Sequence, residues 1–270
     1  NITSAVILVS GADARVTDNT ISVGVGTIDG ILIQAAGALI DGNSILGLGA
    51  SGTGRGIVVD SGAGTLGGIQ ITNNLVDGFG GTGILIDPVF GPSVVGNTVI
   101  NVGGNGIEIV DATGNVTVLN NSVGNVGGKG VYVHGVNDTS VDVITIGGNG
   151  IGEIGNTIGG TGIDVEVVAA GGTIGGNSLA GVYGDGIYLS GSSAAWTISD
   201  NSVSVAGVGS NGIHAVGVSN LAITDNFFAG KNLSANGIYV DSGSATLTNV
   251  LVSGNAVTGF NSLTDQLQEE

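Results

Sequence analysis

The chain repeats short phrases in which hydrophobic positions alternate with other residues. One phrase is a glycine, then Ile or Val, any residue, and a second aliphatic residue; its glycines are Gly30, Gly56, Gly83, Gly106, Gly130, Gly162, Gly186, Gly212 and Gly237. A second phrase sets an asparagine three positions after an aliphatic residue, at Asn19, Asn43, Asn74, Asn97, Asn121, Asn149, Asn177, Asn201, Asn226 and Asn255. Period-two alternation is typical of strands, and the Gly, Asn, Asp and Ser clusters between phrases are typical of turns.

The spacing of these phrases predicts a solenoid. Copies recur about every 25 residues, which suits a coil of short strands, whereas helical crossovers would need longer units. We therefore expect an all-β fold over residues 1–261, a single-stranded right-handed parallel β-helix of about ten coils. Over residues 262–270 we expect an acidic tail or a short capping helix, because Ser262 and Asp265 resemble a capping box and Leu263 and Leu267 form an apolar side.

The phrases also predict how the interior is filled. Residues one and three places after each phrase glycine, such as Ile107 and Ile109, should point inward. Each should stack on the aliphatic residue at the same position of the next coil. Trp196 falls on an inward position where the preceding coil has Gly172, so we expect the large side chain to fill the space left by the small one. The recurring asparagines are expected to turn the chain and hydrogen-bond to one another as an internal ladder.

Composition narrows the setting in which this fold would work. The chain has 55 Gly but only 2 Pro, and 41% hydrophobic residues, so it has material for a core. Lys and Arg total 4 against a formal charge of −17, which argues against a nucleic-acid partner. Cys and Met are absent and no segment approaches a membrane span of about 20 apolar residues. We expect an extracellular or cell-surface protein, of bacterial origin.

The Asn-Asn-x-Val and Gly-Ile-x-Val phrases resemble the generic repeat of the pectate-lyase-like superfamily of right-handed parallel β-helices, over nearly the whole chain. The resemblance implies the fold but leaves the activity open, since that superfamily includes lyases, hydrolases, epimerases, phage tailspikes and surface adhesins. Its enzyme motifs are incomplete here: Asp185 stands where a Gly-His-Gly motif needs His, and Val89 follows Asp87-Pro88 where an epimerase-like motif has His. A lyase base in this group is Arg or Lys, and only Lys129 lies close to the outward face of the strands that follow the phrase glycines.

Residues two and four places after each phrase glycine should face outward as two columns along the rod. These columns hold three of the four Tyr and both His. We expect Tyr132, Tyr188, His214 and Tyr239 to bind an extended glycan. The candidate catalytic residues are Glu108, Asp164, His134 and Glu166. Glu108 and Asp164 would lie roughly 10 Å apart, near the upper end for an inverting hydrolase, and His134 beside Glu166 could act as a base. An ordinary exposed sheet face is the competing interpretation.

Other patterns suggest binding more weakly. The run from Gly159 to Asp164 resembles the start of a calcium-binding nonapeptide, but Glu166 stands where that motif needs a large apolar residue. We expect no dedicated metal site and no cofactor; the only alternative is loose calcium binding by acidic loops, namely Asp138, Asp142 and the pair Asp60 and Asp87. A column of Thr117, Thr145, Thr173 and Thr197 fits β propensity, with ice binding as a remote alternative.

Three aliphatic residues begin the first outward column: Leu32, Val58 and Leu85. Exposed aliphatics in register suggest a patch covered by a second chain, by a neighbouring domain, or by the loop from Gly78 to Gly91 with Phe79 and Phe90. Ile2 to Val9 already reads as strand, so the first coil is open to stacking. Two classes of function remain. The first is a structural or adhesive module that assembles end to end. The second is a protein that uses the outward face on carbohydrates, either as a hydrolase, lyase or epimerase or as a glycan-binding module.

Overall fold

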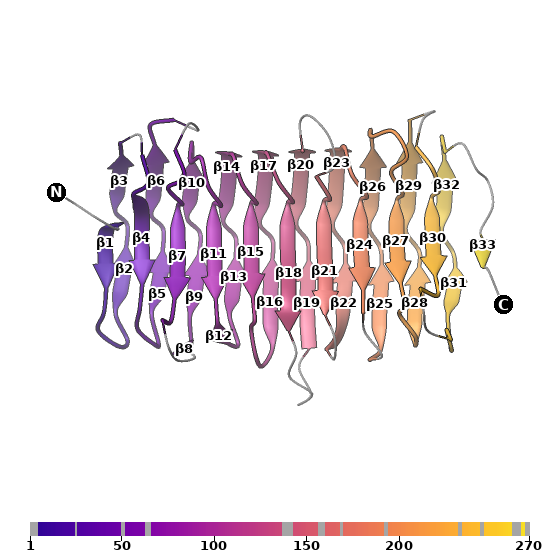
Figure 1. Cartoon of the computed structure of the whole chain (residues 1–270), viewed down its shortest axis with the longest axis horizontal. Helices are drawn as coiled ribbons and strands as arrows, with labels where there is room; N and C mark the ends of the chain where they lie inside the picture. Colours follow the sequence, from indigo (N-terminus) through magenta and orange to yellow (C-terminus); the bar gives the residue numbers. More distant parts are fainter. Residues whose placement is uncertain are drawn as a thin grey trace.

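The computed structural model describes residues 5–24, 26–49, 52–62, 66–136, 143–155, 160–167, 170–191, 194–231, 234–243, 246–260 and 266–267. Its strands form three long parallel sheets that run the length of a rod (Figure 1). We name them sheets A, B and C in the order in which the chain visits them. Within the described ranges no helix is long and apolar enough to cross a membrane.

Each sheet takes one strand from every coil. Sheet A contains β1 (Ala5–Val9), β4 (Asp29–Ile33), β7 (Ile57–Asp60), β11 (Ile84–Asp87), β15 (Ile107–Val110), β18 (Val131–Val136), β21 (Ile163–Val167), β24 (Ile187–Ser190), β27 (Ile213–Val216), β30 (Ile238–Asp241) and β33 (Gln266–Leu267). Sheet B contains β2 (Arg15–Thr17), β5 (Leu39–Asp41), β9 (Gln70–Thr72), β13 (Ser93–Val95), β16 (Val116–Leu119), β19 (Val143–Gly147), β22 (Gly171–Gly175), β25 (Trp196–Ser199), β28 (Leu221–Thr224) and β31 (Leu251–Ser253). Sheet C contains β3 (Thr20–Val23), β6 (Ser44–Gly47), β10 (Leu75–Asp77), β14 (Thr98–Val102), β17 (Ser122–Val126), β20 (Gly150–Ile154), β23 (Ser178–Val182), β26 (Ser202–Val205), β29 (Phe227–Gly230) and β32 (Ala256–Thr258).

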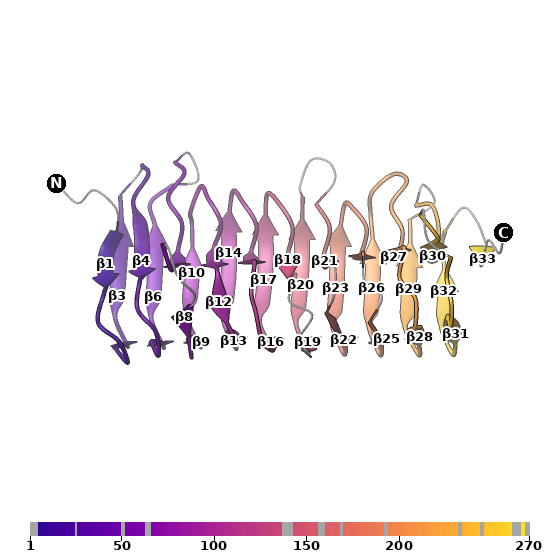
Figure 2. The same cartoon turned by 60° about the horizontal axis from the view of Figure 1, so that its bottom comes forward.

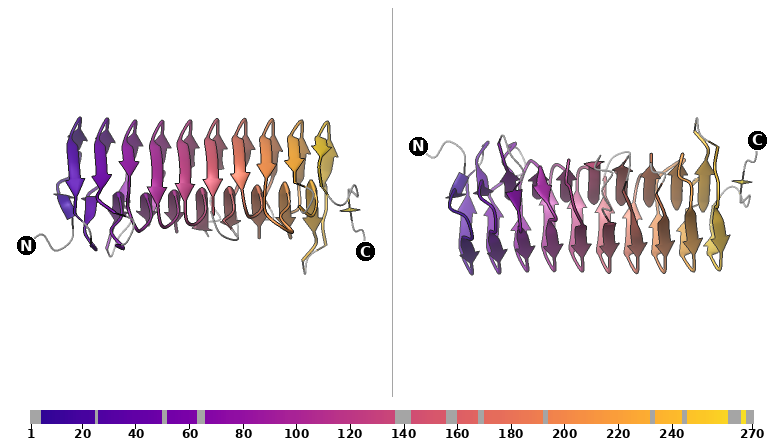
Figure 3. Two further views of the ribbon diagram at one scale, coloured as in Figure 1. Left: turned by 90° about the horizontal axis from the view of Figure 1, so that it is seen from above. Right: turned by 90° about the horizontal axis from the view of Figure 1, so that it is seen from below.

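The described strands make ten sets of three, one set per coil, with β33 added after the last set. A small fourth sheet pairs β8 (Leu66–Gly67) with β12 (Val89–Phe90), in the connections from sheet A to sheet B of two adjacent coils. Figures 2 and 3 show the sheets stacked coil upon coil, with β1 at one end of the rod and β33 at the other. The predicted right-handed parallel β-helix of about ten coils is confirmed.

The interior is an aliphatic column, as the inward positions predict. Ile107 and Ile109 are fully buried and pair in register with Val131 and Val133 of the next coil. Trp196 pairs with Gly172 of the preceding coil and is only 1% exposed, which confirms its packing role. Its indole Nε1 also donates a hydrogen bond to the Ala170 carbonyl, at 3.0 Å. Like-on-like stacking gives each coil matching surfaces above and below, so the core is continuous along the rod.

The turn between sheets B and C is built by the predicted asparagine ladder. In each rung the side-chain amide of one Asn donates to the side-chain oxygen of the next, as between Asn121 and Asn149 at 3.0 Å. The residue before every ladder Asn has a left-handed backbone; these residues are Asp18, Gly42, Asn73, Gly96, Asn120, Gly148, Gly176, Asp200, Asp225 and Gly254. All are Gly, Asn or Asp, the residue types that tolerate this conformation at least cost. The corner is therefore specified twice, by conformation and by the ladder.

The glycine that opens each sheet A phrase is required for a steric reason. A Cβ at Gly83 would meet the Val99 side chain and lie 2.8 Å from the Gly106 carbonyl oxygen of the next coil. Gly106 meets the equivalent obstacles, Val123 and the Gly130 carbonyl. At this corner sheets A and C converge, so only a residue without a side chain lets the coils stack at strand spacing.

The outward aliphatic residues at the start of sheet A form a buried patch. Leu32 and Val58 point away from the main core, yet they are buried to 9% and 1% exposure in a small cluster with Ala5, and Leu85 packs beside them. The aromatic residues expected to cover this patch lie elsewhere. Phe79 packs into the main core, and Phe90 is 59% exposed.

The C-terminal segment extends sheet A as far as it is described. Gln266–Leu267 forms β33, whose residues pair with Tyr239 and Val240 of β30. These two residues are therefore strand where a short helix was one of the two expectations. The rest of 262–270, including the capping box at Ser262 and Asp265, lies outside the described residues, so the tail stays a prediction.

Candidate functional site

Sheet A aligns the outward column that the phrases predict. Its register runs through Leu32, Val58, Leu85, Glu108, Tyr132, Asp164, Tyr188, His214 and Tyr239 without a slip. The second column is also in register from Val110 through His134, Glu166 and Ser190 to Asp241. Every residue assigned to the site from the sequence therefore lies on one face. These residues form two separate groups rather than one continuous stripe.

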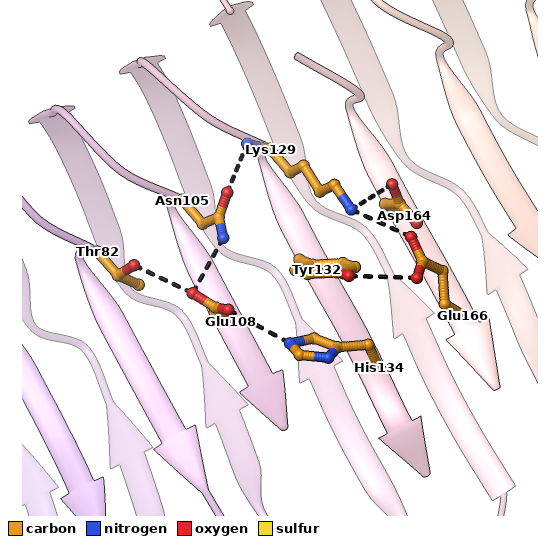
Figure 4. Close-up of polar contacts among 8 residues, drawn as sticks. All are labelled: Thr82, Asn105, Glu108, Lys129, Tyr132, His134, Asp164 and Glu166. Carbon is orange, nitrogen blue, oxygen red and sulfur yellow. Dashed lines mark hydrogen bonds and ion pairs between the residues drawn. The ribbon is translucent and has the colours of Figure 1, made fainter. Parts of the chain in front are cut away.

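The first group centres on three carboxylates, Glu108 on β15 and Asp164 and Glu166 on β21. We call it the carboxylate cluster: Glu108, Lys129, Tyr132, His134, Asp164 and Glu166 (Figure 4). The Thr82 hydroxyl and the Asn105 amide donate to Glu108 Oε2 at 3.1 and 2.9 Å. His134 Nε2 lies 3.3 Å from Glu108 Oε1. Because both oxygens of Glu108 are engaged, this side chain ties three coils together.

Lys129 joins the other two carboxylates of the cluster. Its Nζ lies 2.8 Å from Asp164 Oδ2 and 3.3 Å from Glu166 Oε1. Asp164 is only 4% exposed, and its Oδ1 is buried without a hydrogen-bond partner in the part of the chain that the structure describes. Burial raises the pKa of Asp164 to about 6, against the opposing effect of Lys129. Asp164 is thus a buried, ion-paired carboxylate, and its catalytic role stays a prediction.

Tyr132 is enclosed by the same cluster. Lys129 Nζ lies 3.2 Å from the centroid of its ring, and His134 stacks on the ring at 4.1 Å between centroids (Figure 4). The Tyr132 hydroxyl donates to Glu166 at 3.3 Å. With one side occupied by a cation and the other by an imidazole, this ring cannot stack on a sugar. The expected sugar-stacking role of Tyr132 is therefore not supported by its surroundings.

The carboxylate that contacts His134 is Glu108 rather than the expected Glu166. His134 and Glu166 are opposite each other in the register, but the imidazole contacts Glu108 of the preceding coil instead. Glu166 is drawn away because Lys129 and Tyr132 engage its two oxygens. Register fixes which residues are neighbours, whereas the direction of a long side chain depends on the charges around it.

The second group is a column of three rings on consecutive coils, which we call the aromatic column: Tyr188, His214 and Tyr239. Ring centroids lie 5.2 Å apart between Tyr188 and His214 and 4.9 Å apart between His214 and Tyr239. All three side chains are partly exposed. Asp185 Oδ2 lies 3.0 Å from His214 Nδ1, and the Asn211 backbone and side-chain amides both donate to Asp185 Oδ1. This support orients the imidazole and leaves an amphipathic surface suited to sugar contacts.

Apart from Lys129, the residues that hold both groups in place were not identified from the sequence. Each stands immediately before a phrase glycine, in a column of Asp29, Arg55, Thr82, Asn105, Lys129, Thr161, Asp185, Asn211 and Asn236. Those in contact with the site include Thr82, Asn105 and Asp185. All nine are polar in a chain that is 41% hydrophobic, and that regularity was the available signal.

Features expected to bind calcium or ice remain predictions. Asp60 and Asp87 are neighbours in the register, and burial together with the charges of Asp111 and Asp60 raises the pKa of Asp87. No described group of three or more His, Cys, Asp or Glu side chains is placed to hold a metal ion, and Asp138 and Asp142 lie outside the described residues. The threonine column is in register across β16, β19, β22 and β25.

The ion-paired form of Asp164 predicts a specific pH dependence. Its pKa near 6 exceeds the value near 4 expected in the unfolded chain, so the folded state binds more protons between these values. Asp164 should therefore make the free energy of unfolding fall as pH rises from about 4 to about 6, by up to roughly 3 kcal/mol. Asp164→Asn should remove that fall, which urea denaturation at pH 4.5 and pH 7 measures. The exposed Asp200→Asn is the control, and an equal effect of both variants would contradict the prediction.

Comparison with known proteins agrees with the observed fold. The family described as a right handed beta helix region matches residues 4–166. Among solved structures, the Dettilon tailspike protein (gp208) is similar at 16% identity and a TM-score of 0.36, over 84% of this chain and 60% of that chain. The present chain thus spans 60% of that tailspike chain, and so distant a likeness carries no argument about activity. No curated protein matches the sequence. Since the family match covers more than half of its length, the chain belongs to the right-handed β-helix family.

Proposed function

We propose that this β-helix is a structural or adhesive module of a secreted or cell-surface bacterial protein. The observation that carries the proposal is the engagement of the candidate catalytic carboxylates. Glu108 is held by Thr82, Asn105 and His134, and Asp164 is buried against Lys129. A hydrolase needs one carboxyl group free to donate a proton and another to activate water or attack the sugar. Carboxylates committed to neighbouring coils instead strengthen the rod. End-to-end stacking of copies, through the first and last coils of the rod, would extend the module into a filament.

Glycan binding is the second candidate, favoured by the aromatic column. Tyr188, His214 and Tyr239 offer partly exposed rings at successive coils, and Asp185 holds the central imidazole in place. A rod that presents such a column could adhere to an extended polysaccharide lying along its axis. The carbohydrate-active enzyme remains the alternative, with Glu108 and Asp164 as its catalytic pair.

The deciding experiment incubates the chain with acidic and neutral polysaccharides, with and without calcium. It measures new reducing ends, unsaturated uronates and retention on the polymer. We expect no turnover. Turnover that disappears in Glu108→Gln or Asp164→Asn would make the carboxylate cluster catalytic and refute the structural proposal.

Retention, where it occurs, should depend on the aromatic column. Tyr188→Ala or Tyr239→Ala should weaken binding about fivefold, because each removes a stacking surface worth roughly 1 kcal/mol. Tyr183→Ala is the matched control, since Tyr183 is exposed but stands outside the column. Affinity electrophoresis on the retained polymer gives the ratio, and equal losses in all three variants would place binding elsewhere.

A further inference from the structure

We propose that Lys129 and Asp164 condense into an intramolecular isopeptide bond that covalently joins two adjacent coils. Lys129 precedes β18 and Asp164 lies in β21, the next strand of sheet A. The 2.8 Å separation between Lys129 Nζ and Asp164 Oδ2 places the amine beside the carboxyl carbon (Figure 4). Such preorganised contact replaces a very high concentration of free amine.

The surroundings of Asp164 favour the product over the ion pair. The carboxyl is 4% exposed, and its Oδ1 is buried without a partner in the described chain. A buried charged carboxylate with an unpaired oxygen is costly, whereas a neutral amide in the same place carries no charge and keeps only a carbonyl acceptor. Burial raises the pKa of Asp164 to about 6, so its uncharged acid form is accessible near neutral pH.

Glu166 supplies the proton transfer that the reaction needs. Its Oε1 lies 3.3 Å from Lys129 Nζ, and the Tyr132 hydroxyl holds its other oxygen. The ammonium first gives one proton to the Asp164 carboxylate, which leaves a neutral amine and a neutral acid. The Nζ lone pair then attacks Cγ. Glu166 takes the second proton from Nζ and delivers it to the departing hydroxyl. One C–N bond forms, one C–O bond breaks, and one water leaves, so no oxidant or cofactor is required.

The ion pair between Lys129 and Asp164 slows bond formation, because attack on Cγ needs a neutral amine. Burial acts to lower the pKa of Lys129, but its contact with Asp164 and the charge of Glu166 together raise it. The neutral amine is therefore a small fraction of the population, and we expect the bond to accumulate slowly after folding. Once formed, it would supply the inter-coil covalent link that a chain without cysteine cannot obtain from disulfides.

Mass spectrometry of the intact folded chain tests the proposal. We expect a mass lower than that of the sequence by one water, increasing with incubation time. Trypsin does not cleave after an acylated lysine, so residues 56–231 should remain one peptide, and fragmentation should join Lys129 to Asp164. Water loss alone is insufficient, because Asp-Gly sites such as Asp185-Gly186 can form a cyclic imide with the same mass change.

Matched variants separate these sources. Lys129→Arg keeps the positive charge but cannot form the bond, so it should show the full sequence mass, while Lys231→Arg should cross-link as the parent does. Glu166→Gln should slow the reaction about 100-fold. Persistence of the water loss in Lys129→Arg, or the full sequence mass in parent protein that circular dichroism shows to be folded, would overturn the proposal. A cross-linked chain also lacks the Asp164 carboxyl, so its stability should lose the pH dependence predicted for the ion-paired form.

Discussion

Replacing Asn121 with alanine is expected to lower the free energy of unfolding by about 3 to 5 kcal/mol. The buried side-chain oxygen of Asn121 accepts from the backbone and side-chain amides of Asn97, at 2.9 and 3.0 Å. Its own amide donates to the Val94 carbonyl and to Asn149, both at 3.0 Å. Alanine removes all four bonds and leaves buried polar groups unpaired in two neighbouring coils. Each such group costs roughly 1 to 3 kcal/mol where water cannot replace the lost partner.

The residue beside it gives a matched control. Asn120 is exposed and has a left-handed backbone with φ of 55°, a conformation that glycine adopts readily. Asn120→Gly should therefore change stability by less than about 1 kcal/mol. Urea denaturation followed by circular dichroism compares the two variants, and hydrogen exchange locates the loss within the rod. Similar stabilities for Asn121→Ala and Asn120→Gly would show that the ladder contributes little.

The second large loss of stability is expected on replacing Trp196. Trp196→Ala should cost about 3 to 5 kcal/mol, because it empties the largest fully buried side-chain volume in the described core. Its neighbour in the preceding coil is Gly172, which has no side chain to move into the space. The substitution also removes the 3.0 Å hydrogen bond from the indole to the Ala170 carbonyl. Thermal and urea unfolding measure the loss.

Trp196→Phe divides this effect into its parts. Phenylalanine retains most of the apolar volume but has no N–H group, so it should cost only about 1 to 2 kcal/mol. A loss as large as that of alanine would show that the hydrogen bond dominates. An alanine variant as stable as the parent would mean that the coils collapse into the space, contrary to a rigid stack.

Part of the candidate site was readable from the sequence because strand geometry fixes it. Counting from the phrase glycines places Glu108, Tyr132 and Asp164 on one face, and their register is the one observed. What counting could not give was the partner of each side chain. Lys129 stands in a turn outside the alternating phrase, yet it reaches two carboxylates of the next coil and covers the Tyr132 ring. Lys129 pairs with Asp164 and Glu166, while His134 contacts Glu108 of the preceding coil.

The burial of the apolar patch on sheet A could not be read from the phrases for a related reason. Alternation correctly placed Leu32 and Val58 on the outward face of sheet A, but outward from a sheet does not mean exposed to water. In the folded chain they cluster with Ala5 of β1 and are buried. Exposure depends on everything packed nearby, which a period-two pattern does not record.

The sequence by itself determined the solenoid, its ten coils and the asparagine ladder, because each depends on a local rule repeated at regular spacing. Residues tolerant of a left-handed backbone precede every ladder Asn, and a glycine opens each sheet A phrase where two sheets converge. These constraints act within one coil or between adjacent coils, so the spacing of residues records them. Only the tertiary structure decided which side chains pair, which are buried, and which hydrogen bonds and ion pairs each carboxylate makes. Those outcomes depend on the summed packing and charge of several coils, which bring residues from different turns and strands to a single point.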